Sequence, residues 1–82
     1  MFIIHKKNNN RPLSYFYHNS NGKVKDIIGF SFKSYFSFDS KERAEGKIEN
    51  MKREIRERTD FDLKLSINLF NIFDNLSISE VL

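Results

Sequence analysis

Residues 39–58, DSKERAEGKIENMKREIRER, decide the expected fold because they carry the pattern of one amphipathic helix. Their apolar side chains recur every three or four residues, which places them in a single narrow stripe along a helix: Ala44, Ile48, Met51 and Ile55. Charged residues occupy the remaining positions. We therefore expect one side of this helix to pack on a sheet and the other sides to face water.

The start of this helix carries its own signal. Asp39 is followed three residues later by Glu42, and this D-x-x-E spacing is typical of a capping box. In that arrangement each side chain accepts a hydrogen bond from a backbone N–H of the first turn or of the cap. The sequence predicts that Asp39 is the N-cap.

Upstream of the helix, apolar and aromatic residues predict short strands separated by turns. The expected strands are residues 2–4, 13–18 and 24–32, and the last of them continues as strand through residues 34–38. Residues 13–18 alternate, which puts Leu13, Tyr15 and Tyr17 on one face and Phe16 on the other. The Asn21-Gly22 pair predicts a hairpin turn, and Gly29 predicts a bulge or a close approach within its strand.

Downstream, the apolar period changes from that of a helix to that of a strand. From residue 61 to residue 69, apolar residues alternate with polar ones, which predicts a half-buried strand: Phe61, Leu63, Leu65, Ile67 and Leu69. An apolar tail, residues 70–82, then packs either on the sheet or on a partner. The expected fold is one α+β domain over residues 1–82, a small antiparallel β-sheet (meander) on one amphipathic helix, in the order β-β-β-α-β.

Composition and charge narrow the class of protein. The chain has 82 residues, no cysteine, nine Phe and three Tyr, so stability has to come from packing of aromatic rings. Residues 1–38 hold six Lys or Arg and one acid, Asp26, whereas residues 39–82 hold eight Lys or Arg and ten acids. The apolar runs are too short to span a bilayer. We expect a cytoplasmic protein with no membrane contact.

Residues that could carry chemistry are few. The two histidines, His5 and His18, stand at strand ends without nearby acids, which favours two exposed side chains over a metal site. The helix carboxylates are interleaved with Lys and Arg, so they lack the burial or like charge that perturbs a catalytic pKa. The chain contains no G-x-S-x-G elbow and no glycine-rich phosphate loop. The sequence predicts no enzyme, no cofactor and no metal.

The aromatic residues exceed what one helix can cover, and this predicts a partner-binding surface. Its expected members are Tyr15, Tyr17, Lys25, Lys33, Tyr35, Phe70 and Phe73. The leading hypothesis is a small non-enzymatic protein that acts stoichiometrically on a protein partner. The Asn-, Ile-, Phe- and Lys-rich composition is also what an AT-rich genome favours, which suggests a phage or mobile-element inhibitor of a host enzyme or defence complex, anti-CRISPR-like.

Two alternatives stay open. The first is a basic nucleic-acid-binding domain that stacks bases on an aromatic strand face and contacts phosphates through its cations: Lys6, Lys7, Arg11, Lys23, Lys25 and Lys33. The second is a structural homo-oligomer, such as a homodimer, in which the uncovered sheet face is the interface between copies.

Residues 40–52 also carry a family resemblance. Ser40-Lys41-x-x-Ala44-Glu45-x-x-Ile48-Glu49-x-Met51-Lys52 is similar to the SKxxAExxIExVK helix of the YegP-like family of small proteins of unknown function, and residues 19–24 are similar to its hairpin. The resemblance covers residues 13–55. In the family a glycine directly precedes the isoleucine, whereas here Lys47 separates Gly46 from Ile48. The resemblance implies a β-meander followed by a helix, with pairing of such units, and it implies no activity.

Overall fold

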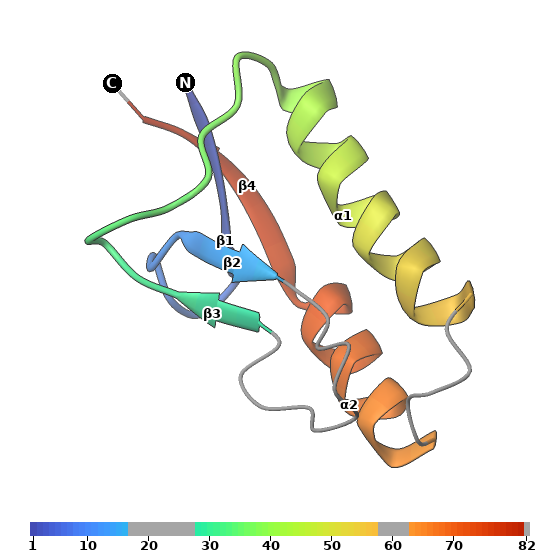
Figure 1. The fold of residues 1–82 in the computed structure, drawn as a ribbon. Helices are drawn as coiled ribbons and strands as arrows, with labels where there is room; N and C mark the ends of the chain where they lie inside the picture. Colours follow the sequence, from blue (N-terminus) through green and yellow to red (C-terminus); the bar gives the residue numbers. More distant parts are fainter. Residues whose placement is uncertain (17–27, 58–62, 82) are drawn as a thin grey trace.

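The computed structural model describes residues 1–16, 28–57 and 63–81. Their elements follow the order β1 (Phe2–Lys6), β2 (Leu13–Phe16), β3 (Ile28–Phe30), α1 (Lys41–Glu57), α2 (Leu63–Asp74) and β4 (Leu76–Glu80) (Figure 1). Small antiparallel sheets combined with helices confirm the α+β class. The predicted order ended in a strand at residues 61–69, whereas α2 lies at residues 63–74 and the last strand, β4, falls in the part that was expected to be an apolar tail.

The strands form two antiparallel pairs. β1 pairs with β4, with Phe2 opposite Glu80 and Lys6 opposite Leu76, and β2 pairs with β3. Single bridges connect Phe2 with Phe38 and His5 with Pro12. The residues of the apolar tail thus pair with the first strand of the same chain, and the two ends of the chain lie side by side (Figure 1). Pairing of β2 with β3 agrees with the expected hairpin, whose Asn21-Gly22 turn lies outside the described residues.

The strand predicted for residues 61–69 is wrong, because its described part belongs to α2. Leu63 and Ile67, which the alternation assigned to the buried face, are exposed, whereas Leu69 and Phe73 are buried at a helical spacing of four residues. Composition also favours a helix here, since Ile67 is the one β-branched residue between positions 63 and 69. The apolar residues that alternate in the sequence therefore lie on different faces of a helix, and their alternation did not indicate a strand.

Two other strand predictions need correction. Residues 34–38 form no strand and have an irregular conformation. Phe36 N–H donates a hydrogen bond to Leu13 C=O at 2.9 Å, and the backbones of Phe38 and Phe2 exchange two hydrogen bonds. Residues 31 and 32 likewise lie outside β3. Phe36 and Phe38 are nevertheless half-buried and pack against the core, while Tyr35, which precedes Phe36, is exposed.

A bulge in β2 changes which side chains enter the core. Leu13 lies opposite Phe30 and Tyr15 lies opposite Gly29, so β2 contains one residue more than β3 at this point. As a result Leu13 is buried while Tyr15 is exposed, and the prediction that they share a face is wrong. The Tyr15 ring lies over Gly29, where an added Cβ would overlap it, so the predicted close approach at Gly29 is confirmed.

The core lies between the helices and the strands. Its buried residues come from every element except β3: Ile4, Leu13, Ala44, Met51, Ile55, Leu69, Phe73 and Leu76. The predicted apolar stripe of α1 is confirmed, with Ile48 packed against the core from a half-buried position. Phe73 contacts Phe16 and Phe70 edge to face, with ring centroids 5.9 and 6.0 Å apart. The contact between Phe73 and Phe16 connects α2 with β2.

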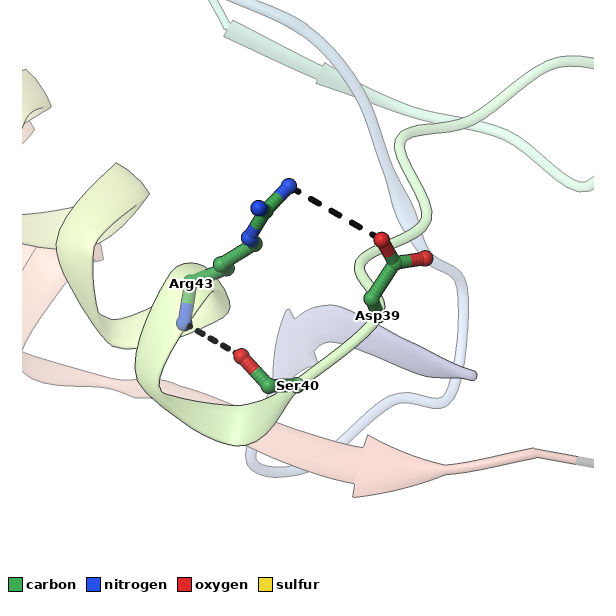
Figure 2. A network of polar contacts seen from close by, with 3 residues as sticks. All are labelled: Asp39, Ser40 and Arg43. Atoms are coloured by element: carbon green, nitrogen blue, oxygen red, sulfur yellow. Dashed lines mark hydrogen bonds and ion pairs between the residues drawn. The ribbon is translucent and has the colours of Figure 1, made fainter.

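The N-cap of α1 is Ser40 and not Asp39, since the helix begins at Lys41. Ser40 Oγ accepts a hydrogen bond from the Arg43 backbone N–H at 3.2 Å (Figure 2). Asp39 instead approaches the Arg43 guanidinium at 3.8 Å, between side chains that are 92% and 72% exposed. A serine one position closer to the helix can reach the free N–H, so the aspartate is displaced to an ion pair on the surface.

Candidate partner-binding surface

The loop between β1 and β2, residues 7–12, is built around one histidine side chain at the end of β1. His5 Nδ1 lies 2.8 Å from the carbonyl oxygen of Lys6 and 2.9 Å from that of Asn9. Both neighbours can only accept a hydrogen bond, so Nδ1 carries a hydrogen and donates it. Within the loop, Asn9 N–H donates to Lys6 C=O at 3.1 Å, and Arg11 N–H donates to Asn9 Oδ1 at 2.8 Å. These hydrogen bonds hold the loop on both sides of Asn9.

Further hydrogen bonds fix this loop to the C-terminal part of the chain. Lys7 N–H donates to Asn75 C=O at 2.8 Å, and His5 Nε2 lies 2.7 Å from Ser79 Oγ on β4. His5 is therefore half-buried with three polar contacts, which corrects the expectation of an exposed strand-end side chain; His18 lies outside the described residues. A loop held on two sides presents its side chains in a defined arrangement.

The contact between His5 and Ser79 has the spacing of a base and a nucleophile, but its surroundings differ from those of a catalytic pair. The far nitrogen of the ring faces two backbone carbonyls and no carboxylate. His5 lines a hollow on the loop side, whereas Ser79 is not among the residues that line it. We interpret the pair as the support of the loop.

Shallow hollows surround this loop. One, of about 580 Å³, is lined by His5, Lys7, Asn8, Asn9, Asn10, Arg11 and Phe32, and we call it the loop hollow. A second, of about 250 Å³, shares Asn9 and Arg11 with it and continues over Gly29 and Phe30. A third, of about 410 Å³, lies between Lys7 and the end of α2, at Asn71 and Asn75. Figure 1 shows the loop and the segment after β3 on the side of the molecule away from α1.

The described residues before position 39 carry an excess of positive charge. Among the described residues up to position 38, the structure contains four basic side chains and neither aspartate nor glutamate: Lys6, Lys7, Arg11 and Lys33. Lys6 Nζ lies 5.1 Å from the centre of the Phe30 ring, a cation–π contact. Lys7, Arg11 and Lys33 are exposed, and so are three rings: Phe32, which lines the loop hollow with Lys7 and Arg11, Tyr35 and Tyr15. We call these four basic residues and three rings the basic face.

The structure divides the residues predicted to bind a partner into three groups. Tyr15, Tyr35 and Lys33 are exposed and belong to the basic face; the tyrosines are 38% and 41% exposed. Phe73, only 2% exposed, and half-buried Phe70 pack in the core, so their rings are not offered to a partner in this conformation. Tyr17 and Lys25 lie outside the described residues.

Sequence reasoning did not select Phe32, which is the most exposed aromatic residue of the described chain at 59%. Its alternation with Ile28 and Phe30 suggested a buried ring in a longer strand. Because β3 ends at Phe30, Phe32 is not part of a strand, and the alternation does not apply to its side chain. The Asn8-Asn9-Asn10 run next to basic residues was the available signal for a solvated loop, but it did not indicate that Phe32 lies beside it.

The described residues offer no metal site, since no cluster of three His, Asp or Glu side chains occurs among them. As far as they are described, neither α1 nor α2 combines the length and apolar character that a bilayer-spanning helix needs. The basic face can attract anionic groups and bury aromatic surface, and these are the requirements of a binding site.

Comparison of the chain with models of protein families, with curated proteins and with solved structures gives no match. The resemblance of residues 13–55 to the YegP-like family therefore stays a prediction. The functional argument depends on the residues and geometry of the basic face.

Proposed function

We propose that this chain is a non-enzymatic binding protein that acts stoichiometrically on a protein partner through its basic face. The observation that carries the proposal is the loop hollow, which brings exposed Phe32 together with the cations Lys7 and Arg11 and has no acid among its lining residues. Aromatic and arginine side chains are enriched at the centres of protein interfaces, where the aromatic rings bury large areas. The complementary partner surface is acidic.

Rings and cations have separate tasks in such an interface. Phe32 and Tyr35 supply the apolar area whose burial drives association, at roughly 25 cal/mol per Å². Lys7, Arg11 and Lys33 favour a negatively charged partner and accelerate encounter with it. A binder of this kind acts by occupying a surface, so it needs no catalytic group of its own.

The role that best suits such a binder is inhibition, as in a phage or mobile-element protein that blocks a host enzyme or defence complex. Support for this part comes from the small chain and its AT-rich type of composition, and it is an analogy between classes of protein. Nucleic-acid binding is the second candidate, favoured by the same acid-free group of cations beside exposed rings.

The test is recovery of a partner from the lysate of the natural host cell, with and without nuclease. Tagged wild-type protein is compared with the double variant Lys7→Gln, Arg11→Gln and with the control Lys41→Gln, Lys64→Gln, which removes two exposed cations from the helices. We expect one protein in equimolar amount in both nuclease conditions, retained by the control and lost by the basic-face variant. If the partner is no longer recovered after nuclease treatment, nucleic acid replaces protein as the proposed partner.

A further inference from the structure

We infer that the loop hollow binds a short acidic peptide segment of the protein partner, with carboxylates at Lys7 and Arg11 and an apolar side chain against Phe32. This inference rests on the proposed function, because it names the chemistry that the basic face recognises. It places the centre of binding at the β1–β2 loop and at Phe32.

The hollow is prepared for a ligand before binding. Its backbone is held by His5 Nδ1, by the Asn9 Oδ1 bond to Arg11 N–H and by the Lys7 N–H bond to Asn75 C=O. Since these bonds already order the loop, a ligand does not have to offset the entropy of ordering it.

The lining has the composition of a site for acidic peptide. Lys7 and Arg11 provide cations on the same short loop, and Arg11 can hold a carboxylate with two parallel hydrogen bonds. Asn8, Asn9 and Asn10 offer amide groups suited to a peptide backbone, and Phe32 offers an apolar surface. A volume of about 580 Å³ holds a few side chains, within the range of about 300–1,000 Å³ usual for ligand sites.

Charge favours a short acidic peptide over a nucleic-acid strand. Among the described residues of the basic face, Lys6 is engaged with the Phe30 ring, which leaves Lys7, Arg11 and Lys33 for an anion. Three cations match a few carboxylates, whereas tight binding to a phosphate backbone commonly uses about 6–10 contacts. Phe32 is the one Phe or Tyr among the residues that line the loop hollow, while single-stranded nucleic acid is usually bound by several rings on which successive bases stack.

The test is an NMR titration of the whole ¹⁵N-labelled chain with the acidic peptide EDEFDEDE, with the neutral peptide QNQFNQNQ as its matched control. We expect amide shifts at residues 6–11 and 31–33 with the acidic peptide and at least a fivefold weaker response to the neutral one. Arg11→Gln should raise the Kd for the acidic peptide about threefold or more. Phe32→Ala should raise it by a similar factor, while Lys64→Gln should leave it unchanged.

Three results would overturn the inference: no shifts at millimolar peptide, shifts centred elsewhere, or tighter binding of an oligothymidylate of equal charge at the same salt concentration. The substituted side chains are exposed, and retention of the wild-type amide spectrum for each variant shows that the fold is intact. If a protein partner is recovered from lysate but Arg11→Gln, Phe32→Ala and excess EDEFDEDE leave its binding unchanged, the proposed function stands and the loop hollow is not the site.

Discussion

The two helices bury their apolar residues in opposite ways. α1 is highly charged, yet its few apolar side chains are in the core from Ala44 near its start to Ile55 near its end. α2 is mostly apolar, yet among its described side chains the buried ones, Leu69 and Phe73, lie in its C-terminal half. At its beginning Leu63 is 77% exposed and, one turn further, Ile67 is 52% exposed.

The difference shows that the burial of a helix residue depends more on where it lies against the strands than on how hydrophobic the helix is. α1 packs against β1, β4 and α2, so its stripe is covered along its length (Figure 1). α2 leads directly into β4 through a turn in which Asn75 N–H donates to Ile72 C=O at 3.0 Å. Its C-terminal end is therefore held in the core, and the Lys52–Asp74 ion pair at 3.7 Å links the same end to α1.

The largest effect is expected from truncating the buried end of α2. Phe73→Ala removes a ring that packs between Phe16 and Phe70, and it should lower the free energy of unfolding by about 3–5 kcal/mol. The matched control, Phe32→Ala, removes an exposed ring and should change it by less than about 0.5 kcal/mol. Urea unfolding followed by circular dichroism measures both; equal losses would show that Phe32 is also buried in solution.

The start of α1 should respond to its cap. Ser40→Ala removes the acceptor for Arg43 N–H and should cost about 1 kcal/mol in the free energy of unfolding. Asp39→Ala breaks only an exposed ion pair and should cost no more than about 0.5 kcal/mol. If the order of these two losses in urea unfolding were reversed, Asp39 and not Ser40 would be the N-cap.

The middle of α1 contains a position that can be improved. A Cβ at Gly46 meets no atom within 4 Å, and the residue is exposed inside a helix. Gly46→Ala should therefore raise the free energy of unfolding by about 0.5–1 kcal/mol, because alanine loses less backbone entropy on folding. A lower thermal midpoint for this variant would mean that the exposed face of α1 contacts something in solution.

The smallest effect is expected at the beginning of α2. Ile67→Gln replaces an exposed apolar side chain and should change the free energy of unfolding by less than about 0.5 kcal/mol, whereas Leu69→Gln should be severely destabilising. The melting temperature of the wild type should not depend on protein concentration. A midpoint that rises with concentration in the wild type and not in Ile67→Gln would support the homo-oligomer, with α2 at its interface.

Part of the candidate site could be predicted from sequence. Tyr15, Tyr35 and Lys33 were predicted to bind a partner, and all three are exposed; that they contact a partner stays a prediction. Phe70 and Phe73 were also selected but pack in the core, since the predicted fold had no second helix to place them there. Phe32 was missed because its exposure depends on the point at which β3 ends.

The amino-acid sequence by itself determined the α+β class, the buried stripe of α1 and the excess of positive charge before position 39. These features depend on the spacing and type of neighbouring residues, which are local properties of the chain. Only the tertiary structure decided that residues 63–74 form a helix, that β4 pairs with β1, and that His5 holds the basic loop against Ser79. The last two features join residues that are distant in sequence. The first depends on whether residues 63–74 pack better as a helix or as a strand, and neighbouring residues alone do not determine that packing energy.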